Sequence, residues 1–275
     1  MKINQHLETL SLKDPDLRRE ALANVLTAEG IPFITQEEDP SFKNPRGVVN
    51  YLTDPGTAKP SLLFCAHYDA VPGSYGANDN ASSLCVLIAL AKELRRLGIM
   101  ARYAFFDGEE KDCAGSRLYV SQADRSVIQA VVNLDVCGFG DTLAICGKGN
   151  EKKAPLRPFI HPALLGKYNG QVLRYLPKSD EASFSGSRIP AMSLSVVPRW
   201  DIQFLKAMAS YGDGFLGRPP EFQMMLEQME VTTTMHGGYR DAPQWVEEEA
   251  MEKAYSYLLE AIQAPPAPRR RFGLL

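Results

Sequence analysis

The sequence predicts an α/β fold with three layers, αβα, in which helices flank a central mixed, mostly parallel sheet. Three observations support this prediction. Of the 275 residues 45% are apolar, five short apolar runs are each bounded by turn residues, and a long helical pattern separates the second run from the third. Runs of this kind are typical of strands buried on both faces, and their alternation with helices indicates a sheet covered on both sides.

The elements can be assigned in order along the chain. Residues 14–30 form an amphipathic pattern that ends at Gly30, which predicts an opening helix. A loop rich in Pro, Asp and Asn follows it. A second helix is expected over 81–97, where Gly98 ends the pattern, and a third with an acidic start over 245–262. The five predicted strands are 48–52, 62–66, 102–106, 130–134 and 191–197.

We expect a single catalytic domain over residues 1–263. The segment 200–230 interrupts the alternation with many Met and aromatic residues. It is either a helical insertion packed on the core or a flap that lines a substrate pocket, since such side chains adapt to varied ligands. The Pro-rich basic tail, residues 264–275, is predicted to be disordered.

Composition and charge narrow the class of protein. Lys and Arg number 30 against 33 Asp and Glu, so clustered basic charge for nucleic-acid binding is not expected. The longest apolar run, 84–91, is far shorter than the ~20 residues of a membrane span. The first residues lack the apolar stretch of a secretory signal, and the five cysteines show no C-x-x-C spacing. We therefore expect a cytoplasmic protein with reduced thiols, whose oligomeric state the sequence does not indicate.

Polar residues follow the predicted strands at the places where ligands gather in α/β sheets. His67 and Asp69 follow the second strand, Glu109 and Glu110 the third, and Asp135 the fourth, while Asp79 lies in the turn before the long helix. Alone, an H-x-D or E-E pair is more typical of a satisfied histidine or a solvated face. Crowded carboxylates are costly, however, unless cations offset their charge. Two divalent ions would do so, and mixed imidazole and carboxylate ligands suit zinc.

These segments together resemble the co-catalytic zinc aminopeptidases of metallopeptidase family twenty-eight, in clan MH. The family pattern is H-x-D, G-A-x-D-x-A-S, E-E followed by G-S, N-L-D, S-D and a late histidine. In this sequence the corresponding segments are His67-Tyr68-Asp69, 76–82, Glu109-Glu110 with Gly115-Ser116, Asn133-Leu134-Asp135, Ser179-Asp180 and His236. The sequence departs from the pattern at Ser83 and Glu181, neither of which matches a metal ligand, and in the Gly-Gly that follows His236 in place of the usual Thr.

The resemblance implies a zinc-peptidase fold, two zinc ions per chain and hydrolysis of N-terminal peptide bonds in a peptide substrate. His67 and Asp135 would hold one ion, Glu110 and His236 the other, and Asp79 would bridge them. Asp69 matches the carboxylate that orients the histidine two residues before it, and Glu109 matches the general base. The resemblance also implies a cis peptide bond after Asp79.

Three alternatives stay open at this stage. A glutaminyl cyclase-like acyltransferase shares the fold and the H-Y-D and F-F-D-G-E-E segments, although relatives carry Trp where this chain has Met235. A non-catalytic binding module would be expected to lack ligands, and none is missing. A glutamate-releasing carboxypeptidase would need convergent arginines, for which Arg188, Arg199 and Arg240 are available.

Overall fold

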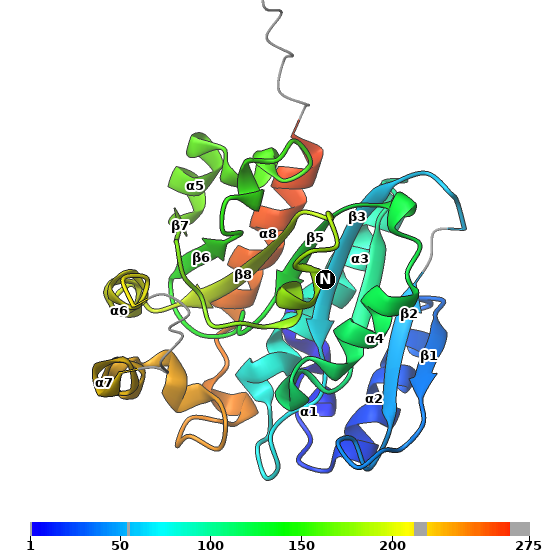
Figure 1. Ribbon diagram of the computed structural model, residues 1–275, viewed down its shortest axis with the longest axis horizontal. Coiled ribbons are helices and arrows are strands. Elements are labelled where there is room, and N and C mark those ends of the chain that lie inside the picture. The colour runs from blue at the N-terminus through cyan, green and yellow to red at the C-terminus, as the bar shows by residue number, and fades with distance from the viewer. Residues whose placement is uncertain (1, 54–55, 212–218, 265–275) are drawn as a thin grey trace, which may run out of the picture.

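A single mixed sheet forms the centre of the molecule (Figure 1), and the computed structural model describes residues 2–53, 56–211 and 219–264. The strand order is β1-β2-β4-β3-β5-β8-β6-β7. The pairs β3/β4, β3/β5, β5/β8 and β6/β7 are parallel, whereas β1/β2, β2/β4 and β6/β8 are antiparallel. The sheet is therefore mixed and mostly parallel, which confirms the prediction. The strands are β1 (Ile34–Glu38), β2 (Val48–Thr53), β3 (Ser61–His67), β4 (Arg102–Phe106), β5 (Ile128–Leu134), β6 (Thr142–Cys146), β7 (Gly170–Val172) and β8 (Ala191–Val197).

Local sequence signals explain where the principal helices begin. The Asp14 carboxylate accepts hydrogen bonds from the backbone N–H groups of Asp16 and Leu17, and Pro15 occupies the first helical position of α2. Glu248 and Glu249 place negative charge at the start of α8, where the helix dipole favours it. The helices are α1 (Leu7–Leu10), α2 (Pro15–Ala28), α3 (Ser82–Arg96), α4 (Ala114–Gln122), α5 (Pro162–Tyr168), α6 (Asp201–Met208), α7 (Pro220–Gln228) and α8 (Glu248–Gln263).

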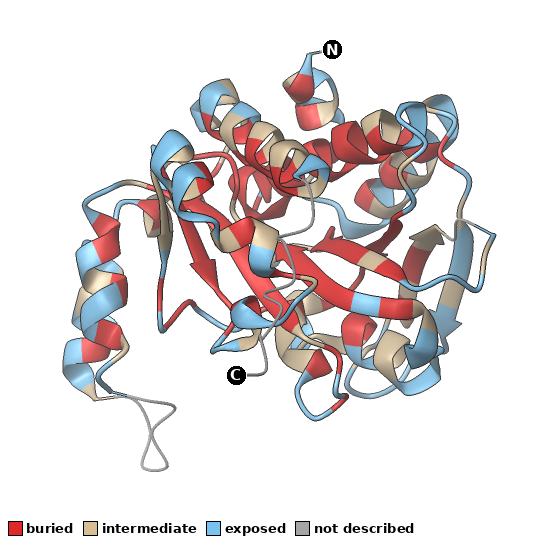
Figure 2. Ribbon diagram, turned by 90° about the horizontal axis from the view of Figure 1, so that it is seen from above, coloured by how far each residue is buried: buried red, intermediate tan, exposed pale blue. Residues whose placement is uncertain are grey.

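Alternating side chains of the central strands bury both faces of the sheet. In β3, Phe64 and Ala66 join the core beneath α2, α3 and α8, whereas Leu63 and Cys65 join the core on the α4 side. Figure 2 shows the buried strands running between helices whose outer surfaces are exposed. This two-sided burial is why these strands appear as continuous apolar runs in the sequence.

Several elements differ from the sequence prediction. The predicted loop after the first helix contains β1, and β6, β7, α1, α4 and α5 were not predicted. Within the segment 200–230, α6 and α7 pack on a third core cluster with Val197, Leu205 and Phe222. Residues 265–275, which hold nearly all of the predicted tail, lie outside the described residues. Among the described residues, no helix has both the length and the hydropathy needed to cross a bilayer.

Candidate functional site

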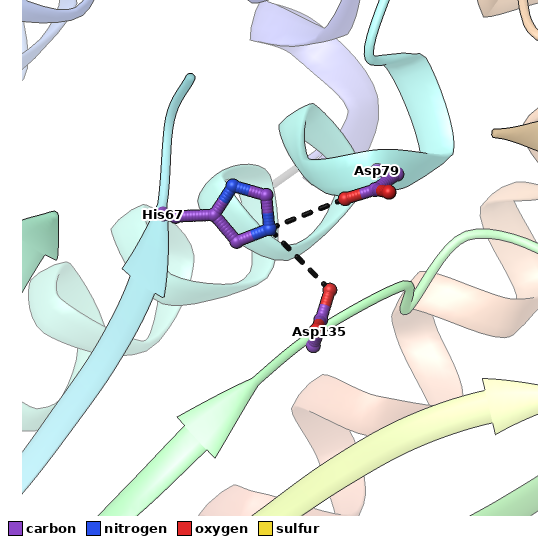
Figure 3. A group of neighbouring side chains, drawn as sticks. All are labelled: His67, Asp79 and Asp135. Atoms are coloured by element: carbon purple, nitrogen blue, oxygen red, sulfur yellow. Dashed lines mark ion pairs between the residues drawn. The ribbon is translucent and has the colours of Figure 1, made fainter. Parts of the chain in front are cut away.

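Three of the expected ligands meet at the carboxyl edge of the sheet (Figure 3). His67 is the last residue of β3, Asp135 directly follows β5, and Asp79 lies in the turn that begins α3. His67 Nε2 is 3.2 Å from Asp79 Oδ1 and 3.5 Å from Asp135 Oδ1. His67 and Asp79 are buried, and these three side chains could hold one metal ion.

A second group forms on the other oxygen of Asp79. His236 Nε2 is 3.0 Å from Asp79 Oδ2 and 3.3 Å from Glu110 Oε1. The Asp79, Glu110 and His236 side chains could likewise hold an ion. The structure therefore brings all five expected ligands together in two groups that share Asp79, and the peptide bond Asp79-Asn80 is cis, as predicted.

Asp69 connects the two sides of the site. Its carboxylate accepts hydrogen bonds from the backbone N–H groups of Glu109 at 2.9 Å and Glu110 at 3.2 Å. Its Oδ1 also lies 3.4 Å from His67 Nδ1. The two glutamates lie in a short 3₁₀ turn, Glu109–Lys111, and not at a strand end. This turn, and not the alternation of a strand, therefore sets the directions of the two side chains.

Two amides beside Asp79, not singled out from the sequence, hold the loops that carry the other ligands. Asn80 Nδ2 donates to the Leu134 carbonyl at 3.0 Å, and its Oδ1 accepts from the Val136 N–H at 3.2 Å. These two bonds flank Asp135 on either side. Asn78 Nδ2 donates to Thr234 Oγ1 at 2.7 Å, two residues before His236. The tripeptide 78–80 therefore fixes both ligand loops.

A buried arginine supports the same turn from behind. Arg18 on α2 is 2% exposed and donates hydrogen bonds to the carbonyls of Leu12, Ser74 and Tyr75. A Cβ at Gly76, which has φ +56°, would collide with Arg18 Nη1. Burial lowers the pKa of Arg18, while the surrounding carboxylates, Asp69 and Asp79 first, raise it. No sequence signal identified this residue, because its partners are backbone carbonyls.

The ionisable groups of the site strongly shift one another's pKa values. Burial alone would lower the pKa of His67, but its carboxylate partners raise that pKa well above the ordinary value. Hydrogen bonds to Asp79 and Glu110 raise the pKa of His236 to about 10. Burial acts to raise the pKa of Asp79, yet hydrogen bonds from both histidines lower it. In the absence of a metal the carboxylates therefore favour protonated histidines, and a bound ion would replace that positive charge.

Whereas the histidines are favoured in their charged form, Glu109 is favoured in its neutral form. It makes no ion pair with either histidine within the described residues, and burial raises its pKa to about 9 against the attraction of His67, with further repulsion from Asp135. Asp180 lies fully buried nearby, and neither of its oxygens has a hydrogen-bond partner in the described chain. Burial raises the pKa of Asp180 to about 7 against the attraction of His67. Added positive charge nearby would favour the ionised form of both carboxyl groups.

An apolar pocket of about 340 Å³ opens beside the ligands. Asp135 and His236 form part of its wall, together with apolar side chains of α6, α7 and the segment after α7, among them Leu205, Leu226 and Met229. The segment 200–230 is therefore both a helical packing element and part of a pocket wall. Neither Trp200 nor Trp245 lines this pocket.

The donor set fits zinc. Two imidazoles and three carboxylates offer nitrogen and oxygen ligands, which suit zinc better than the all-oxygen sets typical of calcium and magnesium. The Glu110 Oε1 atom is buried, and the described residues offer it only the long contact of 3.3 Å to His236 Nε2, itself an expected ligand. Such an atom is suited to a metal ion, because a buried oxygen without a good hydrogen-bond partner is otherwise costly.

Comparisons with known proteins agree with this geometry. A family model described as peptidase family M28 matches residues 48–220. The vacuolar membrane protease of Candida tropicalis is 32% identical over 132 residues, which are 42% of this chain and 14% of the protease. Aminopeptidase YwaD of Bacillus subtilis is 35% identical over 85 residues, 29% of this chain and 19% of that protein. The chain therefore aligns with less than a fifth of either curated relative.

Solved structures show the same fold at low identity. A Zn-dependent exopeptidase from Parabacteroides distasonis superposes with a TM-score of 0.65 at 16% identity, covering 96% of both chains. The glutaminyl cyclase of Porphyromonas gingivalis gives the same TM-score at 17% identity, covering 94% of this chain and 95% of its own. Fold similarity of this kind accommodates both a hydrolase and a cyclase, so the residues of the site must decide between them.

Proposed function

The chain belongs to peptidase family M28, and from this membership we propose that it is an aminopeptidase that holds two zinc ions and hydrolyses N-terminal peptide bonds. One observation carries the proposal. The two oxygens of Asp79 face different histidines, His67 at 3.2 Å and His236 at 3.0 Å. A carboxylate placed in this way can bridge two ions, each completed by one further carboxylate, Asp135 or Glu110.

The residues around the ligands supply the remaining parts of a hydrolytic site. When bound, zinc ions supply Lewis-acid polarisation of the scissile carbonyl and lower the pKa of the attacking water. Glu109 takes the proton of that water and passes it to the leaving amine, acting first as base and then as acid. Asp69 holds the backbone of the turn, so that Glu110 faces His236 while Glu109 is left without an imidazole partner.

The apolar pocket beside Asp135 and His236 suggests where the N-terminal residue binds. Its volume of about 340 Å³ and its apolar wall suit a Leu- or Met-sized side chain. A side chain seated there brings the first carbonyl of the peptide next to the ligands. We therefore expect apolar N-terminal residues to be preferred.

A glutaminyl cyclase is the second candidate, favoured by its equal structural similarity. The pocket wall argues against it, because Met235, which stands where the cyclases carry Trp, lines the pocket, and among the described residues no tryptophan does. The two candidates are distinguished by incubating zinc-reconstituted protein with leucine p-nitroanilide and, separately, with a Gln-Phe-Ala peptide. Release of nitroaniline supports the proposal, whereas cyclisation of the glutamine without hydrolysis contradicts it.

A substitution tests the role of Glu109. Glu109→Gln should retain its zinc and lose about 10²- to 10⁴-fold in turnover, the range typical of a general base. Glu20→Gln, on the exposed surface of α2, is the matched control and should behave as the parent. Metal content is measured on each preparation, and a zinc-loaded Glu109→Gln variant with full turnover would refute the assignment.

A further inference from the structure

A second and larger hollow, of about 770 Å³, adjoins the site on the side of Glu109. Cys113 lines it, and the Cys113 Sγ atom lies 3.9 Å from Glu109 Oε1. Glu181 lines it too, and its carboxylate lies 3.4 Å from Asn133 Nδ2, at the end of β5 that leads to Asp135. Leu176 belongs to the walls of both this hollow and the apolar pocket. The two spaces are therefore neighbours, one beside Asp135 and His236 and the other beside Cys113, which contacts Glu109.

The wall of this hollow is rich in basic residues although the whole chain is slightly acidic. Five Lys and Arg side chains line it against two acidic ones, Asp112 and Glu181. Asp112 is already paired with Arg117 at 2.6 Å. Within the described residues, no carboxylate pairs with three of the cations. The five basic residues are Arg117, Lys148, Lys153, Lys178 and Arg188, and the three without a carboxylate partner are Lys153, Lys178 and Arg188.

The chemistry of the proposed reaction determines which part of a peptide reaches this hollow. The group that protonates the leaving amine must lie beside it, and that group is Glu109. The N-terminal side chain occupies the apolar pocket next to Asp135 and His236, so the rest of the peptide departs past Glu109. The leaving segment of the substrate therefore enters the basic hollow.

We infer that the hollow selects peptides that carry a carboxylate on the leaving side of the scissile bond, held by Lys153, Lys178 and Arg188. This inference rests on the proposed aminopeptidase function and narrows its substrate class to short acidic peptides with an apolar first residue. The carboxylate comes either from an acidic second side chain or from the free carboxyl end of a dipeptide. Both present the same charge to the same cations.

The test compares ratios of kcat/KM measured on one enzyme preparation. Leu-Glu-Ala amide is compared with Leu-Ala-Ala amide, and Leu-Ala free acid with Leu-Ala amide. Two or three exposed ion pairs should favour the acid by about tenfold. A preference in the first pair identifies the side chain as the source of the carboxylate, and one in the second pair identifies the chain end. Ratios near one in both pairs would overturn the inference.

Charge reversal provides the second arm. In the double variant Lys153→Glu and Lys178→Glu, the preference for the peptides that carry the carboxylate should disappear. Leu-Lys-Ala amide should then have a higher kcat/KM than Leu-Glu-Ala amide. Both lysines are exposed, so little effect on folding is expected. Lys43→Glu, an exposed lysine that does not line the hollow, is the control and should keep the ratio of the parent. An acid preference that survives the double reversal would show that these lysines do not hold the carboxylate.

Leucine p-nitroanilide, whose leaving group carries no carboxylate, separates this inference from the proposed function. If the parent cleaves the anilide without preferring acidic peptides, the inference fails and the aminopeptidase stands. If the parent cleaves neither, the proposed function fails. Calorimetric binding of Leu-Glu-Ala amide against Leu-Lys-Ala amide then tests the hollow directly, and equal affinities would overturn the inference.

Discussion

Replacing Asp69 by Asn should weaken zinc binding without removing a zinc ligand. The Asp69 carboxylate accepts two backbone N–H groups, from Glu109 at 2.9 Å and Glu110 at 3.2 Å, and lies 3.4 Å from His67 Nδ1. An Asn side chain keeps one acceptor oxygen and turns an NH₂ group towards the second donor. One hydrogen bond to a charged group is then lost, which costs about 1.5 to 3 kcal/mol.

If this cost falls on the metal-bound state, zinc affinity should drop about 10- to 150-fold, at about 1.4 kcal/mol for each factor of ten. Competition with a chromophoric chelator measures the affinity. Asp112→Asn is the control, because its side chain is 78% exposed and Asn tolerates the left-handed backbone at this position. Zinc affinity of Asp69→Asn within twofold of the parent would refute the role assigned to this carboxylate.

Three further predictions concern stability and specificity. In zinc-free protein, the pKa of Asp180 is about 3.9 in the unfolded chain and about 7 in the folded one. Below pH 4 the carboxyl group is protonated in both states and costs no stability, and the unfolding free energy of the parent falls as the pH rises from 4 to 7. The unfolding free energy of Asp180→Asn relative to the parent should therefore rise by about 4 kcal/mol between pH 4 and pH 8 in urea titrations, and a constant difference would contradict this. Arg18→Leu leaves three backbone carbonyls without their donor and should lower the unfolding free energy by roughly 2 to 4 kcal/mol, whereas a loss below 0.5 kcal/mol, roughly what a surface change costs, would show the arginine to be dispensable. Leu226→Trp narrows the apolar pocket and should shift the best anilide substrate from leucine towards alanine, with unchanged selectivity counting against the pocket assignment.

The ligands could be predicted from the sequence because each is tied to the end of a recognisable strand or to a short motif. His67, Asp135 and Asp79 follow this rule, and the structure brings them together as expected. The residues that hold them could not be found in this way. Asn78 and Arg18 bond to Thr234 and to backbone carbonyls in distant loops, and such pairings depend on the finished fold. The basic hollow was also missed, because its cations come from separate parts of the chain.

The strands likewise divide into those that the sequence predicts and those that it does not. Strands β3, β5 and β8 are buried on both faces, so their continuous apolar runs could be recognised in the sequence. The edge strand β1 is mostly exposed, and its sequence Ile-Thr-Gln-Glu-Glu carries no hydrophobic alternation that could have indicated it. The buried strand β6 is different, since Thr-Leu-Ala-Ile-Cys is a short apolar run before a glycine, and a signal for it was present.

The tripeptide Asn78-Asp79-Asn80 is hydrogen-bonded to the segments that carry ligands on both sides of the site. Asn80 anchors the chain on both sides of Asp135, and Asn78 anchors the segment before His236. The segments around Asp135 and before His236 are therefore both bonded to the turn that precedes α3. Since one ligand of each group is thus tied to one short turn, a substitution in that turn should disturb both groups of ligands together.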